Sequence, residues 1–192
     1  VDPENVESTE NGAVVELQNV HAASGQALGI DVSKWQGKID WQAVKSDGID
    51  FAIIRIGYRG ENGVIYRDAN ADYNIQQAQK AGLLVGVYFF STAVNKQEAK
   101  QEAAFCTEAV KGYKISYPVV YDCEGYDNPS SRMYNVSAQA RTDNAIAFLS
   151  HIKSAGYDAM IYGAKSDFEN GTYWNMAKIE NDYKVWVAQY SA

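Results

Sequence analysis

The chain has few of the side chains that most often bind metals or act as nucleophiles. Among 192 residues there are two histidines and two cysteines. His21 falls in a polar amino-terminal stretch and His151 in a helical pattern, and neither has a partner at a spacing typical of a zinc site or a Ser-His-Asp triad. Both kinds of centre are therefore poorly supported.

Basic clusters and long apolar runs are also missing. The formal net charge is −7, and no stripe of Lys and Arg appears, which argues against nucleic acid or an anionic membrane as partner and favours a neutral or basic polymer. No apolar run reaches the roughly 18 residues of a membrane-spanning helix. No signal peptide is present, so any export signal is expected to have been removed or never to have existed.

What the chain does have is enough apolar sequence for one core. Hydrophobic residues make up 46% of the composition, and the length predicts one domain. Residues 1–27 are acidic and polar around the short apolar stretch AVVELQNV, which predicts a linker that could add one strand. We expect the folded domain to cover residues 28–192.

From Leu28 onward, short apolar runs rich in β-branched residues alternate with amphipathic segments. Near-continuous hydrophobic strands separated by helices predict an α/β fold, with a parallel sheet that is covered on both faces or closed into a barrel. The expected strands lie in LGIDVS, FAIIRIGY, LLVGVYFF, YPVVYDCEG, AMIYGAK and VWVAQY.

Polar and aromatic residues gather at the carboxyl ends of these strands, where such folds carry their chemistry. Carboxylates ringed by Tyr and Trp suit sugars, because the rings stack on apolar sugar faces while acids and amides bond to hydroxyls. The residues at these ends are Asp31, Ser33, Arg55, Tyr58, Tyr88, Phe90, Ser91, Asp122, Glu124, Tyr162, Trp186, Gln189 and Tyr190.

The stretch VVYDCEGY places Asp122 and Glu124 one residue apart at the end of a buried strand. Alternate side chains of a strand share a face, so both carboxyls point the same way, roughly 6.6 Å apart along the backbone. Repulsion and partial burial should raise the pKa of at least one of them. This pattern is typical of a carboxylic acid that stays protonated near neutral pH.

The segments GIDVSKWQGKIDW, FAIIRIGY, DYNIQQAQKAGLLVGVYFF, YPVVYDCEG, AMIYGAK and VWVAQY resemble, in order and spacing, the family 25 glycoside hydrolases, lysozymes of the Chalaropsis type. The resemblance covers about residues 28–190. Its most specific parts are D-x-S-x-x-Q (Asp31, Ser33, Gln36) and the D-x-E of Asp122 and Glu124.

The resemblance implies an irregular TIM-like barrel with mostly parallel strands. It also implies an extracellular or cell-surface enzyme that cleaves the β-1,4 bond between N-acetylmuramic acid and N-acetylglucosamine in peptidoglycan glycan strands, with no metal or organic cofactor. Glu124 would be the general acid, Asp122 its partner carboxylate and Asp31 a third acid. An inverting mechanism and a substrate-assisted one both stay open. The expected substrate-binding residues are Tyr58, Tyr88, Tyr162, Trp186, Tyr190, Arg55 and Gln189.

Structural roles compete with several of these assignments. Asp31 could be only a helix cap, and Arg55 only a counter-ion. About half of the strand-end rings are expected to contact sugar, while Trp35 and Trp41 are expected to pack helices against the barrel. The two cysteines are Cys106 and Cys123. Cys123 should face the helical layer, where it could form a disulfide with Cys106 or stay a buried thiol.

Two other functions and one departure from the family complete the expectations. A catalytically weak glycan-binding relative would lack Glu124, and a chitinase-like hydrolase would need an acid where Val120 stands. After Trp186, Ala188 and Tyr190 the family usually continues to a closing strand with V-D-x-N. We therefore expect six strands from Leu28, with the last strands missing and the edges exposed in a monomer or paired in a dimer.

Overall fold

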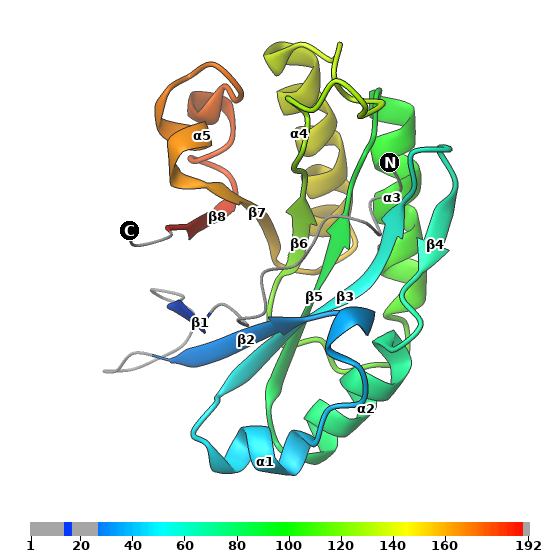
Figure 1. Ribbon diagram of the computed structural model, residues 1–192, viewed down its shortest axis with the longest axis vertical. Helices are drawn as coiled ribbons and strands as arrows, with labels where there is room; N and C mark the ends of the chain where they lie inside the picture. Colours follow the sequence, from blue (N-terminus) through cyan, green and yellow to red (C-terminus); the bar gives the residue numbers. More distant parts are fainter. Residues whose placement is uncertain (1–13, 17–26, 190–192) are drawn as a thin grey trace.

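The computed structural model describes residues 14–16 and 27–189, which form one curled sheet with helices along its outer side (Figure 1). The strands are β1 (Val14–Glu16), β2 (Leu28–Val32), β3 (Phe51–Arg59), β4 (Ile65–Arg67), β5 (Leu84–Phe90), β6 (Val119–Asp122), β7 (Ala159–Ala164) and β8 (Lys184–Ala188). The helices are α1 (Trp41–Ser46), α2 (Ala71–Lys80), α3 (Lys96–Ala109), α4 (Ala138–Ser154) and α5 (Lys165–Glu169), with 3-10 turns η2 (Lys34–Gln36) and η3 (Met176–Lys178).

The sheet follows the order β1-β2-β3-β5-β6-β7-β8, and β4 pairs with β3 outside this path. All neighbours from β2 to β8 along the path are parallel, whereas β1 and β4 pair antiparallel with β2 and β3. Among the described strands the path ends at β1 and β8 without closing. The expected mostly parallel α/β architecture is thus confirmed as an open half-barrel, while β4 was not expected.

Side chains alternate between two cores because successive residues of a strand point to opposite faces. In β6, Val120 packs on the inner face, whereas Val119 and Tyr121 pack on the outer face. The inner core is formed by Phe51, Ile53, Tyr117, Val120, Met160 and Trp186. The larger outer core lies between the sheet and the helices, so both faces of the central strands are covered.

Three of the described helices, α1, α3 and α4, begin at a residue whose side chain accepts a backbone N–H group of the first turn. Asn95 accepts from the N–H of Glu98 at the start of α3, and Ser137 accepts from that of Ala140 at the start of α4. Such caps satisfy donors that the helix itself leaves open.

The outer core buries both cysteines as free thiols. Cys123 faces the helices, as expected, and its Sγ lies 3.7 Å from Sδ of Met133.

Gly86 of β5 allows a close approach below the site. A Cβ at this position would lie 2.6 Å from the carbonyl oxygen of Pro118 and 2.7 Å from Cδ1 of Ile53. The Pro118 oxygen belongs to the backbone and Ile53 to the inner core, so a side chain at position 86 would displace packed atoms.

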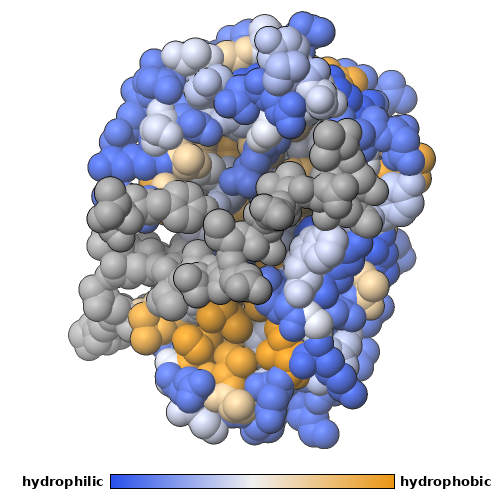
Figure 2. Space-filling view, in the orientation of Figure 1, coloured by the Kyte–Doolittle hydropathy of each residue, from blue (hydrophilic) through white to orange (hydrophobic). Residues whose placement is uncertain are grey.

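The face in Figure 2 is mostly hydrophilic, with one apolar area between β2 and α1. None of the helices in the described ranges is long and apolar enough to cross a membrane. In folds of parallel strands and helices the chemistry lies at the carboxyl ends of the strands.

Candidate active site

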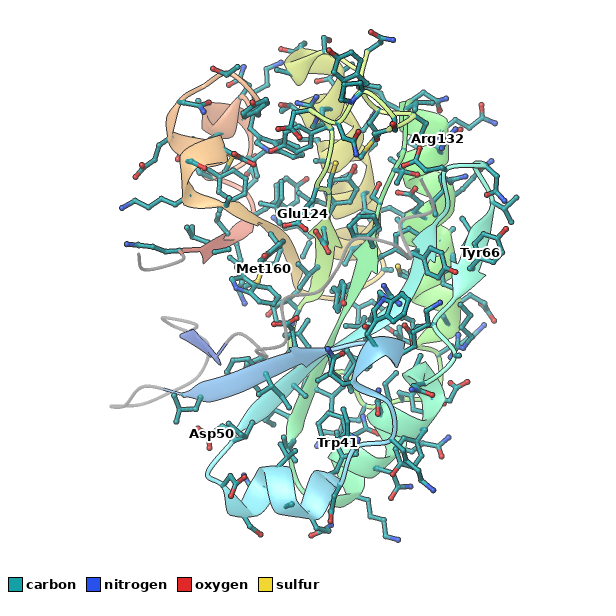
Figure 3. All side chains as sticks on the ribbon, viewed as in Figure 1. Trp41, Asp50, Tyr66, Glu124, Arg132 and Met160 are labelled. Atoms are coloured by element: carbon teal, nitrogen blue, oxygen red, sulfur yellow. The ribbon has the colours of Figure 1, made fainter. Side chains whose placement is uncertain are left out.

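Three carboxyl groups come together at the carboxyl ends of β2 and β6. Asp31 lies in β2 and Asp122 is the last residue of β6. Glu124, labelled in Figure 3, follows two positions later. The inner-face alternation that buries Val120 continues through Asp122. The charge of Asp31 raises the pKa of both Asp122 and Glu124, and the charge of Glu124 raises that of Asp122.

Asp122 is the most deeply placed of these acids, with 7% of its surface exposed. Its Oδ1 atom finds no hydrogen-bond partner within the described ranges. Burial raises the pKa of Asp122 well above its usual range, and repulsion from Glu124 and Asp31 raises it further, while Arg55 acts in the opposite direction. Burial is thus a larger cause than the neighbouring charge on which the sequence argument depended.

Glu124 is exposed, unlike Asp122. Partial desolvation of its carboxyl raises the pKa of Glu124, a hydrogen bond from Tyr162 lowers it, and the charges of Asp167 and Asp31 raise it. Because Asp122 and Glu124 influence each other, their protons leave in two steps that belong to the pair. The pair keeps one proton to a higher pH than an isolated carboxyl would.

Asp31 is half-buried, and burial raises its pKa to about 6, against a backbone hydrogen bond that lowers it. It is not the cap of the turn that follows. Ser33 caps that turn: its Oγ accepts from the N–H of Trp35, and Oε1 of Gln36 accepts from the N–H of Ser33 at 2.8 Å. Within D-x-S-x-x-Q, two residues therefore build the turn and leave the acid to the site.

Arg55 is held at the edge of the site by an acid that the sequence analysis did not identify. Its Nε donates to Oδ2 of Asp68 at 2.8 Å, and its guanidinium carbon lies 5.2 Å from the ring centre of Tyr58. Asp68 is 2% exposed and accepts from the N–H groups of Lys34 and Asn70 as well. Arg55 is therefore a counter-ion, as one interpretation expected, and Asp68 is its partner.

Nη2 of Arg55 is buried and finds no hydrogen-bond partner among the described residues. The guanidinium is held in place through Nε, which bonds to Asp68, while the N–H groups of Nη2 donate to no described residue. The site thus contains two buried polar atoms without partners among the described residues. One is the donor Nη2 of Arg55, and the other is the acceptor Oδ1 of Asp122, whose pKa Arg55 influences. Native proteins rarely leave such groups unsatisfied except at functional sites.

Tyr88 lies in the middle of this arrangement, beside Arg55 across the β3–β5 pairing. Burial raises the pKa of its phenol far above the usual range, and the charges of Arg55, Asp122, Asp31 and Asp68 all act on it. The phenol is therefore a neutral hydrogen-bonding group in the centre of the acids.

Tyr162 and Trp186 form the side of the site next to β8. Their rings meet edge to face, with centres 4.8 Å apart and planes at 69°. Trp186 is 5% exposed and belongs to the inner core, so it supports Tyr162. Gln189 is exposed just after β8, and Tyr190 lies outside the described residues.

The comparison with family models matches residues 30–192 to the glycosyl hydrolases family 25. The chain belongs to this family. It is 31% identical over 168 residues to Lysozyme M1 of Streptomyces globisporus, a match that covers 84% of this chain and 54% of that protein. It is 30% identical to a probable family 25 lysozyme 2 of Dictyostelium discoideum, with 84% and 71% covered. The chain thus spans only about half the length of Lysozyme M1.

Solved structures of the family have the same fold. The bacterial lysozyme of Streptomyces coelicolor superposes with a TM-score of 0.72 at 28% identity, covering 89% of this chain and 77% of that one. The modular autolysin LytC of Streptococcus pneumoniae, solved with a synthetic peptidoglycan ligand, has a TM-score of 0.65 at 26% identity, covering 73% and 33%.

A second group of residues that the sequence did not indicate supports the Glu124 side of this family 25 site. The Tyr126 hydroxyl donates to Asp167 of α5 and accepts from Nε1 of Trp174 at 3.3 Å. The guanidinium carbon of Arg141 lies 4.0 Å from the Tyr126 ring centre. These residues come from the loop after β6, from α4, from α5 and from the loop after α5, so only the fold brings them together.

Two tryptophans were expected to pack helices against the barrel, and one of them does not. Trp41 is 2% exposed and its Nε1 donates to Oδ1 of buried Asn74, as expected for a packing residue. Trp35 is 47% exposed, so the prediction of a packing role for it is wrong. The capped turn η2 directs its ring outward, away from the core.

No group of three or more His, Cys, Asp or Glu side chains within the described ranges could hold a metal ion. The chemistry that these residues offer on their own is proton transfer and charge stabilisation by carboxyl groups.

Proposed function

We propose that this family 25 domain is a muramidase that hydrolyses the β-1,4 bond between N-acetylmuramic acid and N-acetylglucosamine in bacterial peptidoglycan, outside the cell. The observation that carries the proposal is the coupled pair at the end of β6, in which Asp122 is buried and Glu124 exposed. The names of the relatives support it, as does the peptidoglycan ligand of LytC.

Glu124 is the general acid in this proposal. Glu124 is exposed as a residue, so its side chain can reach the oxygen of a bound glycosidic bond, and the raised pKa of its carboxyl keeps a proton available there. The proton passes to the leaving oxygen as the bond from that oxygen to the anomeric carbon breaks. The charges that remain around the site stabilise the cation-like transition state.

Asp122 orients the 2-acetamido group of the muramic acid. In this proposal its Oδ1, which has no partner among the described residues, accepts the amide N–H, and the amide oxygen then attacks the anomeric carbon as the leaving group departs. Water afterwards adds to the anomeric carbon and loses its proton to the Glu124 carboxylate, which restores the acid and frees the amide. Asp31 adds negative charge, and Tyr58, Tyr88 and Tyr162 contact the sugar.

The alternatives receive less support. A glycan-binding relative without activity has no reason to keep Glu124 and its hydrogen bond from Tyr162. A chitinase-like enzyme needs an acid at Val120, which is fully buried in the inner core.

The product of digestion tests the proposal. Purified peptidoglycan is digested, the new reducing ends are reduced with borohydride, and the fragments are identified by mass spectrometry. We expect reduced muramic acid. Reduced glucosamine would indicate a glucosaminidase, and free peptide amines would indicate an amidase or peptidase, so either result contradicts the proposal.

A further inference from the structure

A row of rings, exposed at its two ends, lies beside the candidate active site along the β3–β4 side of the sheet. We define the aromatic ridge as Trp35, Lys34, Tyr58 and Tyr66, which follow one another through printed contacts. The Lys34 Nζ lies 4.9 Å from the Trp35 ring centre and 5.6 Å from that of Tyr58, and Tyr58 stacks on Tyr66 with centres 5.2 Å apart.

The ridge is joined to the acids by Arg55. This residue lies over the Tyr58 ring and also acts on the charge of Asp122. The ridge therefore begins where the candidate site ends and leads outward to Tyr66, which Figure 3 shows on the side of the molecule away from Glu124 and β8.

Its two outer rings are exposed although a packed core lies close by. Trp35 is 47% exposed and Tyr66 38%. A single exposed ring is ordinary, but two rings linked into one row with the site are a feature typical of sugar-binding surfaces, since each ring can stack on the apolar face of one sugar.

Trp35 is held in its exposed position by the backbone around it. Ser33 and Gln36 form the capping box of η2, and the Lys34 N–H donates to buried Asp68 at 3.0 Å. The side chain of Asn70 donates to the carbonyl oxygen of Gly37 at 3.0 Å. The turn is therefore fixed at both ends, and the ring can bind a ligand without first losing loop freedom.

Tyr66 is fixed in a comparable way. Its hydroxyl accepts from Nδ2 of Asn62 at 2.7 Å. The turn between β3 and β4 is closed by the Gly63 N–H, which donates to Gly60, and the Gly63 carbonyl accepts from Nη1 of Arg59 at 2.6 Å. Both outer rings of the ridge are thus preorganised by contacts that involve no ligand.

We infer that the aromatic ridge is an additional binding subsite for the glycan strand, holding amino sugars beyond the pair whose bond is cleaved. The inference rests on the proposed function and extends it. The ridge would then determine which substrate lengths bind well. Long glycans reach Trp35 and Tyr66, while short ones contact only the carboxyl groups and the tyrosines beside them.

The test compares soluble, peptide-free glycan fragments of four and of eight or more sugars as substrates. For Trp35→Ala and Tyr66→Ala, we expect KM for the long fragment to rise about tenfold, an effect of the size expected for losing one ring contact. We expect kcat on the long fragment and both constants on the short one to stay unchanged.

Two control variants separate the rings from other effects. Tyr66→Phe keeps the ring and loses the bond to Asn62, so it should bind long fragments like the parent chain. Leu84→Ala removes a side chain of similar exposure, 43%, at the amino end of β5, and should change neither substrate's kinetics. Equal effects of the alanine variants on both lengths, or no effect on either, would overturn the inference.

Sedimentation with insoluble peptidoglycan, measured by the protein left in solution, gives a readout that needs no catalysis. If the parent chain binds but cleaves neither fragment, the proposed function fails, and weaker binding by Trp35→Ala and Tyr66→Ala still supports the ridge. If the parent chain cleaves, and the variants bind peptide-free glycan as it does but bind intact peptidoglycan more weakly, the inference of a sugar subsite is overturned in favour of a peptide contact.

Discussion

Arg55 and Arg59 lie on the same strand, β3, but they point to opposite faces of the sheet and differ in how fully their nitrogen atoms are hydrogen-bonded. Arg59 points to the helical layer, where Nε donates to Glu102 at 2.6 Å and its remaining nitrogens reach Gly63, Glu98 and Gln101. Arg55 points to the inner face and keeps a buried Nη2 without a partner in the described part of the chain.

The acids beside them differ in the same way. Glu102 is completely buried on α3, where it accepts from Ser91 at 2.6 Å and from Arg59. Asp122 is buried at the end of β6 with one oxygen unsatisfied. Arg59 and Glu102 have hydrogen-bond partners without a ligand. Arg55 Nη2 and Asp122 Oδ1 would find partners only in a bound molecule. The Arg59–Glu102 pair therefore contributes to the fold, whereas Arg55 and Asp122 each keep a buried polar atom that a ligand could bond.

The largest effect should come from the inner side. Glu124→Gln removes the proposed acid while keeping its size, so we expect activity on peptidoglycan to fall about 1,000-fold, within the range for general acid catalysis. The thermal midpoint should change little, because Glu124 is exposed. Turnover by the reducing-end assay and unfolding by circular dichroism measure both, and unchanged turnover would contradict the assignment. Asp122→Asn should lose less activity if the acetamido group is the nucleophile.

On the outer side the effect should be on stability. Glu102→Ala leaves Arg59 buried without its carboxylate, so we expect the free energy of unfolding to fall by about 3 kcal/mol. The control is Glu108→Ala on the same helix, whose side chain is 76% exposed and paired with Lys111, and which should be neutral. Urea unfolding of both variants measures the difference. Similar values for the two would show that the buried network contributes no more than a surface ion pair.

Neutralising an inner acid should have the opposite sign. The folded-state pKa of Asp31 is about 6, above its ordinary 3.8, so ionising it costs stability as the pH rises through 6. Asp31→Asn should therefore stabilise the protein at pH 7 by at most about 3 kcal/mol, and the gain should disappear below pH 4. Unfolding free energies across this range test it, and a gain that does not depend on pH would exclude this cause.

The smallest effect should sharpen the account of the inner pair. The Tyr162 hydroxyl lowers the pKa of Glu124, so Tyr162→Phe should move the alkaline limb of the activity profile to higher pH. The ring stays in place against Trp186, and the fold should be unaffected. A limb that moves to lower pH, or does not move, would mean that this limb does not report Glu124.

Local sequence was sufficient for the elements and for one cluster of acids. Apolar runs with β-branched residues predicted the six parallel strands, and period-2 alternation placed Asp122 and Glu124 on one face with Cys123 on the other. The short β4 escaped this reasoning because three residues carry too little pattern. The roles of the site residues, and the division into a linker and a catalytic unit, remain proposals.

The tertiary structure alone decided which buried charges have partners. Nothing in the spacing of the sequence pairs Arg55 with Asp68, Arg59 with Glu102, or Tyr126 with Asp167, because each pair joins segments whose distance depends on how the sheet curls. The exposure of Trp35 was likewise decided by the fold, because its sequence context fits a buried residue equally well. Periodicity determines the face on which a side chain lies, but burial and pKa depend on everything that packs against that face.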